Sequence, residues 1–363
     1  GANITFTGAL VTQTLTTAAE PYNLDLHGSG TTITNAVAFA HTGTLALGNT
    51  ADDILLFNGA LTATTPSGVT LNGQVRTSGD TISIGDAGTG VTLAGTTSVL
   101  DSTNNGGEVQ GANILVGGAV DGTTANTQNL TVNGGEDGTA TFSGHIGETT
   151  PIATLTLTNG DLATADRKIT ASGITVNGGG TFGLGQSPSG AWDVDNVSIA
   201  SGATMNATTG TFKVSGSWSN SGTFNHNDRT VTLDGTGQTL SGATSFYNLT
   251  KNVTSADTLT FTKETANKTT ITNTLNLSGA SGHLLSLRSS TAGTQWEIDP
   301  RGTRTIAYLD VKDSNNVNAT AINAAGTSSI DSGNNTKWTI PPTITSFSPT
   351  SGGKNTSVII TGT

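Results

Sequence analysis

The chain has 363 residues, a net charge of −11 and no cysteine, which excludes thiol catalysis and cysteine metal sites. Nucleic acid is disfavoured as a partner, because phosphate contacts need cationic side chains and only 14 residues are Lys or Arg. No apolar run reaches the length of a membrane-spanning helix. The apolar fraction of 33% is low for an enzyme with one thick core. It suits a thin core that is repeated many times.

From residue 1 to about residue 190, short segments of alternating apolar and polar residues are separated by Gly, Asn and Ser. Alternation predicts strands with one buried face, while Gly and Asn supply the positive φ angles of turns. Threonine is abundant, and its branched side chain favours strands. We expect strands at residues 3–8, 31–39, 43–48, 53–59, 68–73, 81–85, 90–95, 113–118, 129–135, 139–144, 153–160, 173–179 and 181–185.

Two arrangements of these strands are open. Asn-Gly pairs recur between them and could form two-residue hairpins, giving an antiparallel sandwich or a string of Ig-like modules. A period near 20 residues instead favours a solenoid, a parallel β-helix of about 14 to 17 turns. In that fold, outward threonines form ladders and inward residues stack in a column. The expected column is Leu130/Val132, Leu155/Leu157, Ile174/Val176 and Phe182/Leu184.

Residues 191–340 continue the pattern of short alternating segments separated by Gly, Asn and Ser, but the spacing between segments is less regular. Gly-Thr-Phe recurs at residues 180–182, 210–212 and 222–224, and all four tryptophans lie between residues 192 and 338. We expect a second part of the same solenoid with longer loops, in which the large aromatic side chains fill the core. The chain is thus divided into a β-helix at 1–190, its continuation at 191–340, and a tail at 341–363.

The tail begins at Pro341-Pro342, which cannot continue a ladder of strands. It predicts a stiff linker followed by the first strands of a new module. At the end of this tail, Ser357, Val358, Ile359, Ile360 and Thr361 form a β-branched strand that we expect to take part in assembly.

Two parts of the chain resemble known families. Residues 222–250, 284–316 and 331–340 resemble repeats of very large bacterial surface proteins of the adhesin or filamentous-haemagglutinin type. That resemblance implies a right-handed parallel β-helix. The tail, with Ile344, Phe347, Pro349 and Gly352 before a strand, resembles the start of an IPT/TIG Ig-like domain. Neither family supplies catalytic residues.

Few residues suggest chemistry. Asp193 and Asp195 should face outward from one strand, where sugar-cleaving β-helix enzymes hold their acid and base, or where calcium could bind. Glu136 and Asp137 lie in a Gly-rich segment similar to one calcium-binding repeat. Calcium is therefore the one cofactor considered, and the expected assignment is no metal and no cofactor. The five histidines lack metal-ligand spacing and read as solvated loop residues.

These patterns predict a secreted bacterial cell-surface protein without enzymatic activity: a rod-like filament, stalk, surface-layer subunit or adhesin shaft. The alternative is a protein that binds or cleaves polysaccharide, with Asp193 and Asp195 as acid and base. The expected partners are further copies of the chain, joined head to tail because terminal turns leave strand edges open, and cell-surface glycans.

Overall fold

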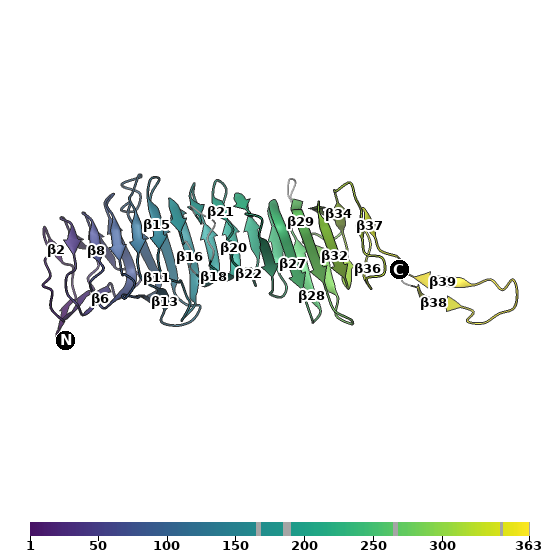
Figure 1. Ribbon diagram of the computed structural model, residues 1–363, viewed down its shortest axis with the longest axis horizontal. Coiled ribbons are helices and arrows are strands. Elements are labelled where there is room, and N and C mark those ends of the chain that lie inside the picture. Colours follow the sequence, from purple (N-terminus) through teal and green to yellow (C-terminus); the bar gives the residue numbers. More distant parts are fainter. Residues whose placement is uncertain (165–167, 184–189, 264–267, 342–343, 363) are drawn as a thin grey trace. The chain divides into compact units, whose positions relative to one another are not determined.

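The computed structural model describes residues 1–164, 168–183, 190–263, 268–341 and 344–362. Within these ranges the regular structure consists of β-strands, without a helix. The strands pair in parallel and stack as a β-solenoid of about 14 turns, apart from an antiparallel hairpin near the C-terminus (Figure 1). The predicted parallel β-helix is therefore confirmed, and the antiparallel alternative is wrong for the described residues that precede the C-terminal hairpin.

The chain divides into two compact units. Unit 1 comprises residues 1–213 and 220–227, and unit 2 comprises residues 214–219 and 228–363. Strands β22 (Phe212–Val214) and β23 (Trp218–Asn220) lie where the chain passes from one unit to the other.

In unit 1 the strands form three columns, a column being the strands that occupy the same place in successive turns. The first contains β1 (Asn3–Phe6), β3 (Asn23–Leu26), β6 (Thr44–Leu47), the first halves of β9 (Gly68–Thr77) and β11 (Val91–Asp101), and β13 (Val120–Gly122). The second contains β2 (Val11–Thr12), β4 (Thr31–Ile33), β7 (Ile54–Phe57), the second halves of β9 and β11, β14 (Asn129–Asn133), β16 (Ile152–Asn159), and the second halves of β18 (Ile169–Val176) and β20 (Trp192–Ile199). The first halves of β18 and β20 continue the first column after β13, through Ile146. The third contains β5 (Val37–Ala38), β8 (Leu61–Ala63), β10 (Ile82–Ile84), β12 (Ile114–Val116), β15 (Thr139–Phe142), β17 (Asp161–Ala163), β19 (Thr181–Phe182), β21 (Thr204–Asn206) and β24 (Thr223–Asn225).

Unit 2 repeats this plan. One column contains β25 (Thr230–Leu233), the second halves of β27 (Thr244–Asn252) and β29 (Lys268–Ser278), and β32 (Thr303–Ala307). Another contains β26 (Thr239–Ser241), β28 (Asp257–Phe261), β30 (Leu285–Ser289), β33 (Leu309–Val311) and β36 (Ile330–Asp331). The last contains the first halves of β27 and β29, then β31 (Trp296–Pro300) and β34 (Ser314–Asn316), while β35 (Ile322–Asn323) pairs with β37 (Trp338–Thr339).

The predicted inward column is largely confirmed. Leu130 pairs with Leu155 and Leu155 with Ile174, and all three side chains are buried. Phe182 was wrongly placed, since it lies in the third column of strands, where it pairs with Leu162. The column continues instead through Val197/Ile199, which follow Ile174/Val176 on β20. Leu184 lies outside the described residues.

Aromatic side chains fill the interior of each unit. In unit 1, Trp192 is fully buried with its ring edge-on to Phe182 and Phe212, at centroid distances of 5.3 and 5.2 Å. In unit 2, Trp296 is fully buried and stacks on Phe261 at 3.8 Å. Burying one such side chain stabilises the fold by roughly 2–3 kcal/mol. The expectation that the large aromatic residues pack in the core is confirmed for these rings.

The corners between columns explain a second difference from the sequence prediction. Residues 31–39 were expected to form one strand, but they form β4 and β5 in different columns, with Asn35 between them. The Asn35 side-chain amide donates a hydrogen bond to the Thr14 hydroxyl at 2.9 Å, which ties this corner to the preceding turn. Alternation alone cannot locate such a bend, because β-branched and apolar residues continue across it.

Candidate functional site

Strand β20 presents the two carboxylates singled out in the sequence. Trp192 and Val194 are buried, while Asp193 and Asp195 are exposed on the opposite face, as alternation predicts. The neighbouring strand β18 places the neutral Thr170 beside Asp193 in the register. The pair therefore faces outward from the wall of unit 1, and on the β18 side the register places a threonine beside it.

Glu136 and Asp137 are exposed in the turn between β14 and β15. Their backbone N–H groups donate to the carbonyl oxygens of Val109 and Gln110, each at 2.9 Å, so main-chain bonds fix this turn to the preceding loop. Among the residues that the structure describes, no three His, Asp or Glu side chains are grouped as a metal site. The calcium candidates are thus placed on separate turns, Glu136 and Asp137 on one and Asp193 and Asp195 on another.

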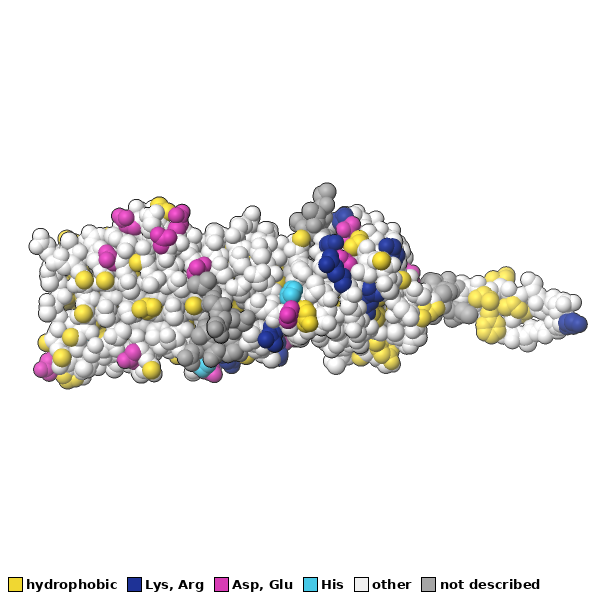
Figure 2. Space-filling model, turned by 45° about the horizontal axis from the view of Figure 1, so that its top comes forward, with side chains coloured by type: hydrophobic (Ala, Val, Ile, Leu, Met, Phe, Trp, Pro, Cys, Tyr) yellow, Lys and Arg dark blue, Asp and Glu magenta, His cyan; other side chains and the backbone are white. Residues whose placement is uncertain are grey.

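Charge is distributed unevenly between the two units. Unit 1 contains 16 Asp or Glu and four Lys or Arg, whereas unit 2 contains nine and ten, giving net charges of −12 and +1. On the face drawn in Figure 2, most Lys and Arg side chains lie over the turns that contain β29 to β34. The low overall cation content therefore conceals a local concentration of cations in unit 2.

His145 lies in a hollow of unit 1 lined by small residues, among them Gly117, Gly118 and Gly144. Its Nδ1 accepts a hydrogen bond from the Lys168 backbone N–H at 2.9 Å, so the neutral ring carries its proton on Nε2. That nitrogen is 3.5 Å from a carboxylate oxygen of Glu148. Sequence reasoning assigned this histidine to a solvated loop, and no residue spacing signals the contact.

Unit 2 encloses a charged group that the sequence analysis also missed. The side chain of Lys251 on β27 is completely buried. Its ammonium group is 2.7 Å from a carboxylate oxygen of Asp257, 2.7 Å from the Gly235 carbonyl oxygen and 2.8 Å from Oε1 of Gln238. An ammonium group has three N–H donors, so each has an acceptor here.

Asp257 is the anionic partner of this lysine. Burial raises the pKa of its carboxyl, but the hydrogen bond and charge of Lys251 and the backbone N–H of Gly237 outweigh burial and lower the pKa below its usual value. The Asp257 carboxyl is therefore ionised around neutral pH. Such a pair is tolerated because the ammonium group meets a carboxylate and two neutral oxygen acceptors at short range.

A second network surrounds the carboxylate of Asp299. Lys268 and Arg301 contact the same carboxylate oxygen at 3.3 and 3.0 Å, and the Asn318 amide donates to the other at 2.9 Å. Burial raises the pKa of Asp299, and the hydrogen bonds from Asn318, Arg301 and Lys268 together lower it further than burial raises it. Because Asn318 lies after β34, these contacts hold a loop against β29 and β31.

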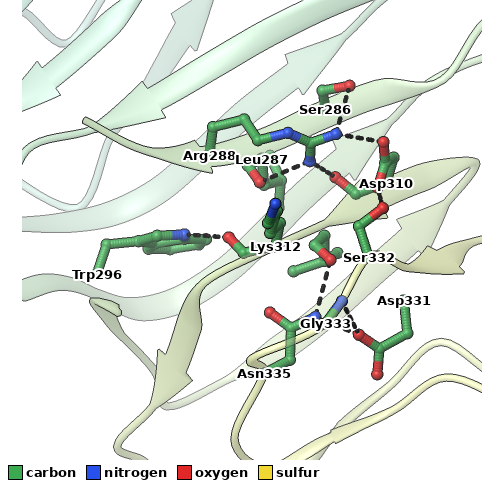
Figure 3. A network of polar contacts seen from close by, with 11 residues as sticks. Ser286, Leu287, Arg288, Trp296, Asp310, Lys312, Asp331, Ser332, Gly333 and Asn335 are labelled. Atoms are coloured by element: carbon green, nitrogen blue, oxygen red, sulfur yellow. Dashed lines mark hydrogen bonds and ion pairs between the residues drawn. The ribbon is translucent and has the colours of Figure 1, made fainter. Parts of the chain in front are cut away.

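A third network, shown in Figure 3, joins three successive turns of unit 2. The guanidinium of Arg288 on β30 donates to the carboxylate and the backbone carbonyl of Asp310 on β33. The Ser332 hydroxyl, which follows β36, donates to the other carboxylate oxygen of Asp310 at 2.5 Å. All three networks share one arrangement: a carboxylate on one strand contacts a cationic side chain from another strand.

The expected assembly strand lies in the C-terminal hairpin, where β39 (Ile359–Gly362) pairs antiparallel with β38 (Ile344–Ser348). Val358, Ile359 and Ile360 are 50, 70 and 63% exposed. Ser357 is also exposed, and Thr361 pairs with Ser346. These two strands form a two-stranded sheet. The Ig-like module itself stays a prediction.

The fold and these networks define a parallel β-solenoid repeat protein. Comparisons with known protein families, with curated protein sequences and with solved structures find no match. Among the described residues there is no helix of the length and apolarity needed to cross a membrane.

Proposed function

We propose that this protein is a structural component of a bacterial cell surface, secreted and built as a rod-like shaft, filament or surface-layer subunit, without enzymatic activity. The observation that carries the proposal is the stacking of parallel strands through nearly all of the described chain. Strands of this kind give a stiff element, because each turn is hydrogen-bonded to the turns on both sides.

The charged networks support the same function. Asp257, Asp299 and Asp310 each neutralise a cation that comes from a neighbouring strand or turn. In an enzyme of this fold such groups would converge on a groove and leave an acid and a base for substrate. In unit 2 they fasten loops to strands, which is what a load-bearing solenoid needs.

Self-assembly through the C-terminal hairpin is part of this proposal. The apolar residues Val358, Ile359 and Ile360 are exposed, and an exposed strand edge is a template for pairing with another chain. A second copy of the chain that adds a strand to β38 or β39 would bury these side chains. Repeating that contact head to tail builds a fibre.

The test compares the intact chain with Ile360→Lys by particle mass in solution and by negative-stain electron microscopy. The proposal predicts filaments or a mass that rises with concentration for the intact chain, and monomers for Ile360→Lys. The control is Leu115→Lys, which places the same charge at an exposed apolar position of β12 and should leave assembly unchanged. Monomers of the intact chain at high concentration would rule assembly out, and so would filaments that persist in Ile360→Lys.

A further inference from the structure

The buried network around Lys251 in unit 2 holds an amine, a carboxamide and a carboxylate in contact. These are the groups that an amide-forming reaction needs, and the inference does not depend on what the outer surface of the protein binds. We propose that the Lys251 amine and the Gln238 carboxamide join in an intramolecular amide bond, with Asp257 as the group that transfers protons. The bond would link β27 covalently to the start of β26, two adjacent strand segments of one turn. It would be a modification that the protein carries out on itself.

The first observation behind this inference is that the reacting side chains are buried and in contact with one another. Lys251 is 0% exposed, Gln238 is 1% exposed and Asp257 is the carboxylate that contacts the lysine. The Lys251 nitrogen lies 2.8 Å from Oε1 of Gln238, in direct contact with the carboxamide it would attack. Groups held in contact inside a protein react with effective concentrations of about 10⁵ M or more. An amine enclosed away from water is also a stronger nucleophile than a solvated one.

The orientation of the carboxamide is the second observation. Nε2 of Gln238 donates hydrogen bonds to the carbonyl oxygens of Val214 and Gly216, at 2.8 and 2.7 Å. These bonds turn Oε1 toward the ammonium group of Lys251. If the amide were flipped, its N–H groups would face the N–H groups of the lysine, and neither could accept a hydrogen bond. The leaving nitrogen therefore faces two carbonyl oxygens, which stabilise positive charge as that nitrogen becomes ammonium.

The reaction balances without an oxidant or a cofactor. Lys251 gives one proton to the Asp257 carboxylate, and the neutral amine attacks the carboxamide carbon of Gln238. A new C–N bond forms to the lysine, and the bond from that carbon to Nε2 breaks. The departing nitrogen takes a second proton from the lysine nitrogen and the proton held by Asp257. The products are an amide, one ammonium ion and a regenerated Asp257 carboxylate.

Mass spectrometry of the purified, folded chain tests the proposal. The expected mass is lower than that of the sequence by one ammonia. Trypsin should not cut after the acylated Lys251, so residues 230–263 should appear as one peptide that lacks one ammonia. A second protease that cuts after Phe246 should open the loop into two chains that stay linked through Gln238 and Lys251.

Two variants serve as controls. Lys251→Arg keeps the cation but cannot form the amide, and Asp257→Asn keeps the shape but cannot accept the proton, so both should have full mass. Asn-Gly pairs such as Asn133-Gly134 can also lose ammonia by forming a succinimide, which mild base reopens, whereas the proposed amide withstands mild base. The proposal is overturned if the folded protein has full mass and trypsin cuts after Lys251. It is also overturned if the mass deficit maps to an Asn-Gly pair or persists in Lys251→Arg.

Discussion

At the scale of single residues, the interior of this protein accepts polar groups when neighbouring segments of the chain supply their hydrogen-bonding partners. Lys251 is buried in unit 2 with an acceptor for each of its three hydrogens. The sequence does contain a signal for it, since period-two alternation from the buried Leu249 places Lys251 on the same inward face. What alternation could not supply was the partners, because Asp257 and Gln238 come from other segments of the chain.

His41 of unit 1 is the opposite case, a buried titratable side chain without an ionic partner. Its ring is 0% exposed, stacks on Tyr22 at 5.1 Å and meets the edge of Phe39 at 5.9 Å. Its Nε2 lies 3.3 Å from the Thr44 carbonyl oxygen. Burial lowers the pKa of His41, outweighing that hydrogen bond, because the charged imidazolium loses its hydration.

This histidine predicts a pH dependence of stability. The unfolded chain binds a proton at His41 near pH 6.5, while the folded chain binds it only at lower pH. Stability due to the neutral ring is therefore present above pH 6.5 and decreases as the pH falls from there toward the folded pKa. Denaturant unfolding at several pH values should show that decrease, and His41→Phe should reduce it while keeping the aromatic stack.

The control for this experiment is His283→Gln, which changes an exposed histidine. It should leave the pH profile of the natural chain unchanged. The account of His41 fails if His41→Phe retains the full decrease between pH 6.5 and 5.

At the scale of elements, the strand alternation of unit 1 was readable because successive turns place like residues in register. Leu155, for example, is matched by Leu130 before it and Ile174 after it. Side-chain amides add to this order, as in the hydrogen bond from Asn23 to Asn3 at 2.8 Å. The four-residue strand β3 was missed, although β6 of the same length was expected from the sequence.

The assignment of residues to columns was less predictable. Phe182 was expected to continue the second column but lies in the third, because turns of unequal length shift the count along the chain. In unit 1 one turn takes 20 residues between Asn3 and Asn23 but 32 between Ser98 and Leu130. The strands thus stay in register although the loops between them differ in length, and for this reason the sequence shows no constant repeat length.

Close backbone stacking at the corners leads to a prediction for glycine. A Cβ added at Gly144 would overlap the carbonyl group of Gly118 in the preceding turn, and backbone atoms cannot move aside cheaply. Gly144→Ala should therefore destabilise the protein by about 2–3 kcal/mol, the usual cost of overpacking. The matched control is Gly68→Ala in β9, where no atom lies within 4 Å of the added carbon.

Thermal or denaturant unfolding of the two variants provides the measurement. Gly68→Ala should unfold within about 0.5 kcal/mol of the natural chain. Equal stabilities for Gly144→Ala and Gly68→Ala would show that the corners of unit 1 are looser than described.

At the scale of the whole molecule, a sequence with 33% apolar residues supports two compact units because the solenoid core is thin and repeated. Each turn needs only a few inward residues, while threonine and asparagine form the outer wall. The excess of negative charge belongs to unit 1, and unit 2 pairs several of its cations, among them Lys251, Lys268 and Arg288, with its own carboxylates. A thin core and internally paired charges are both compatible with the structural function proposed above.

The central claim is that this solenoid is a structural part of the cell surface. Its most direct test is immunogold electron microscopy with antibody against unit 1, applied to intact cells that produce the protein and to the same cells after permeabilisation. The account predicts gold on the outside of intact cells, on extended or layered material. Gold that appears only after permeabilisation would contradict it.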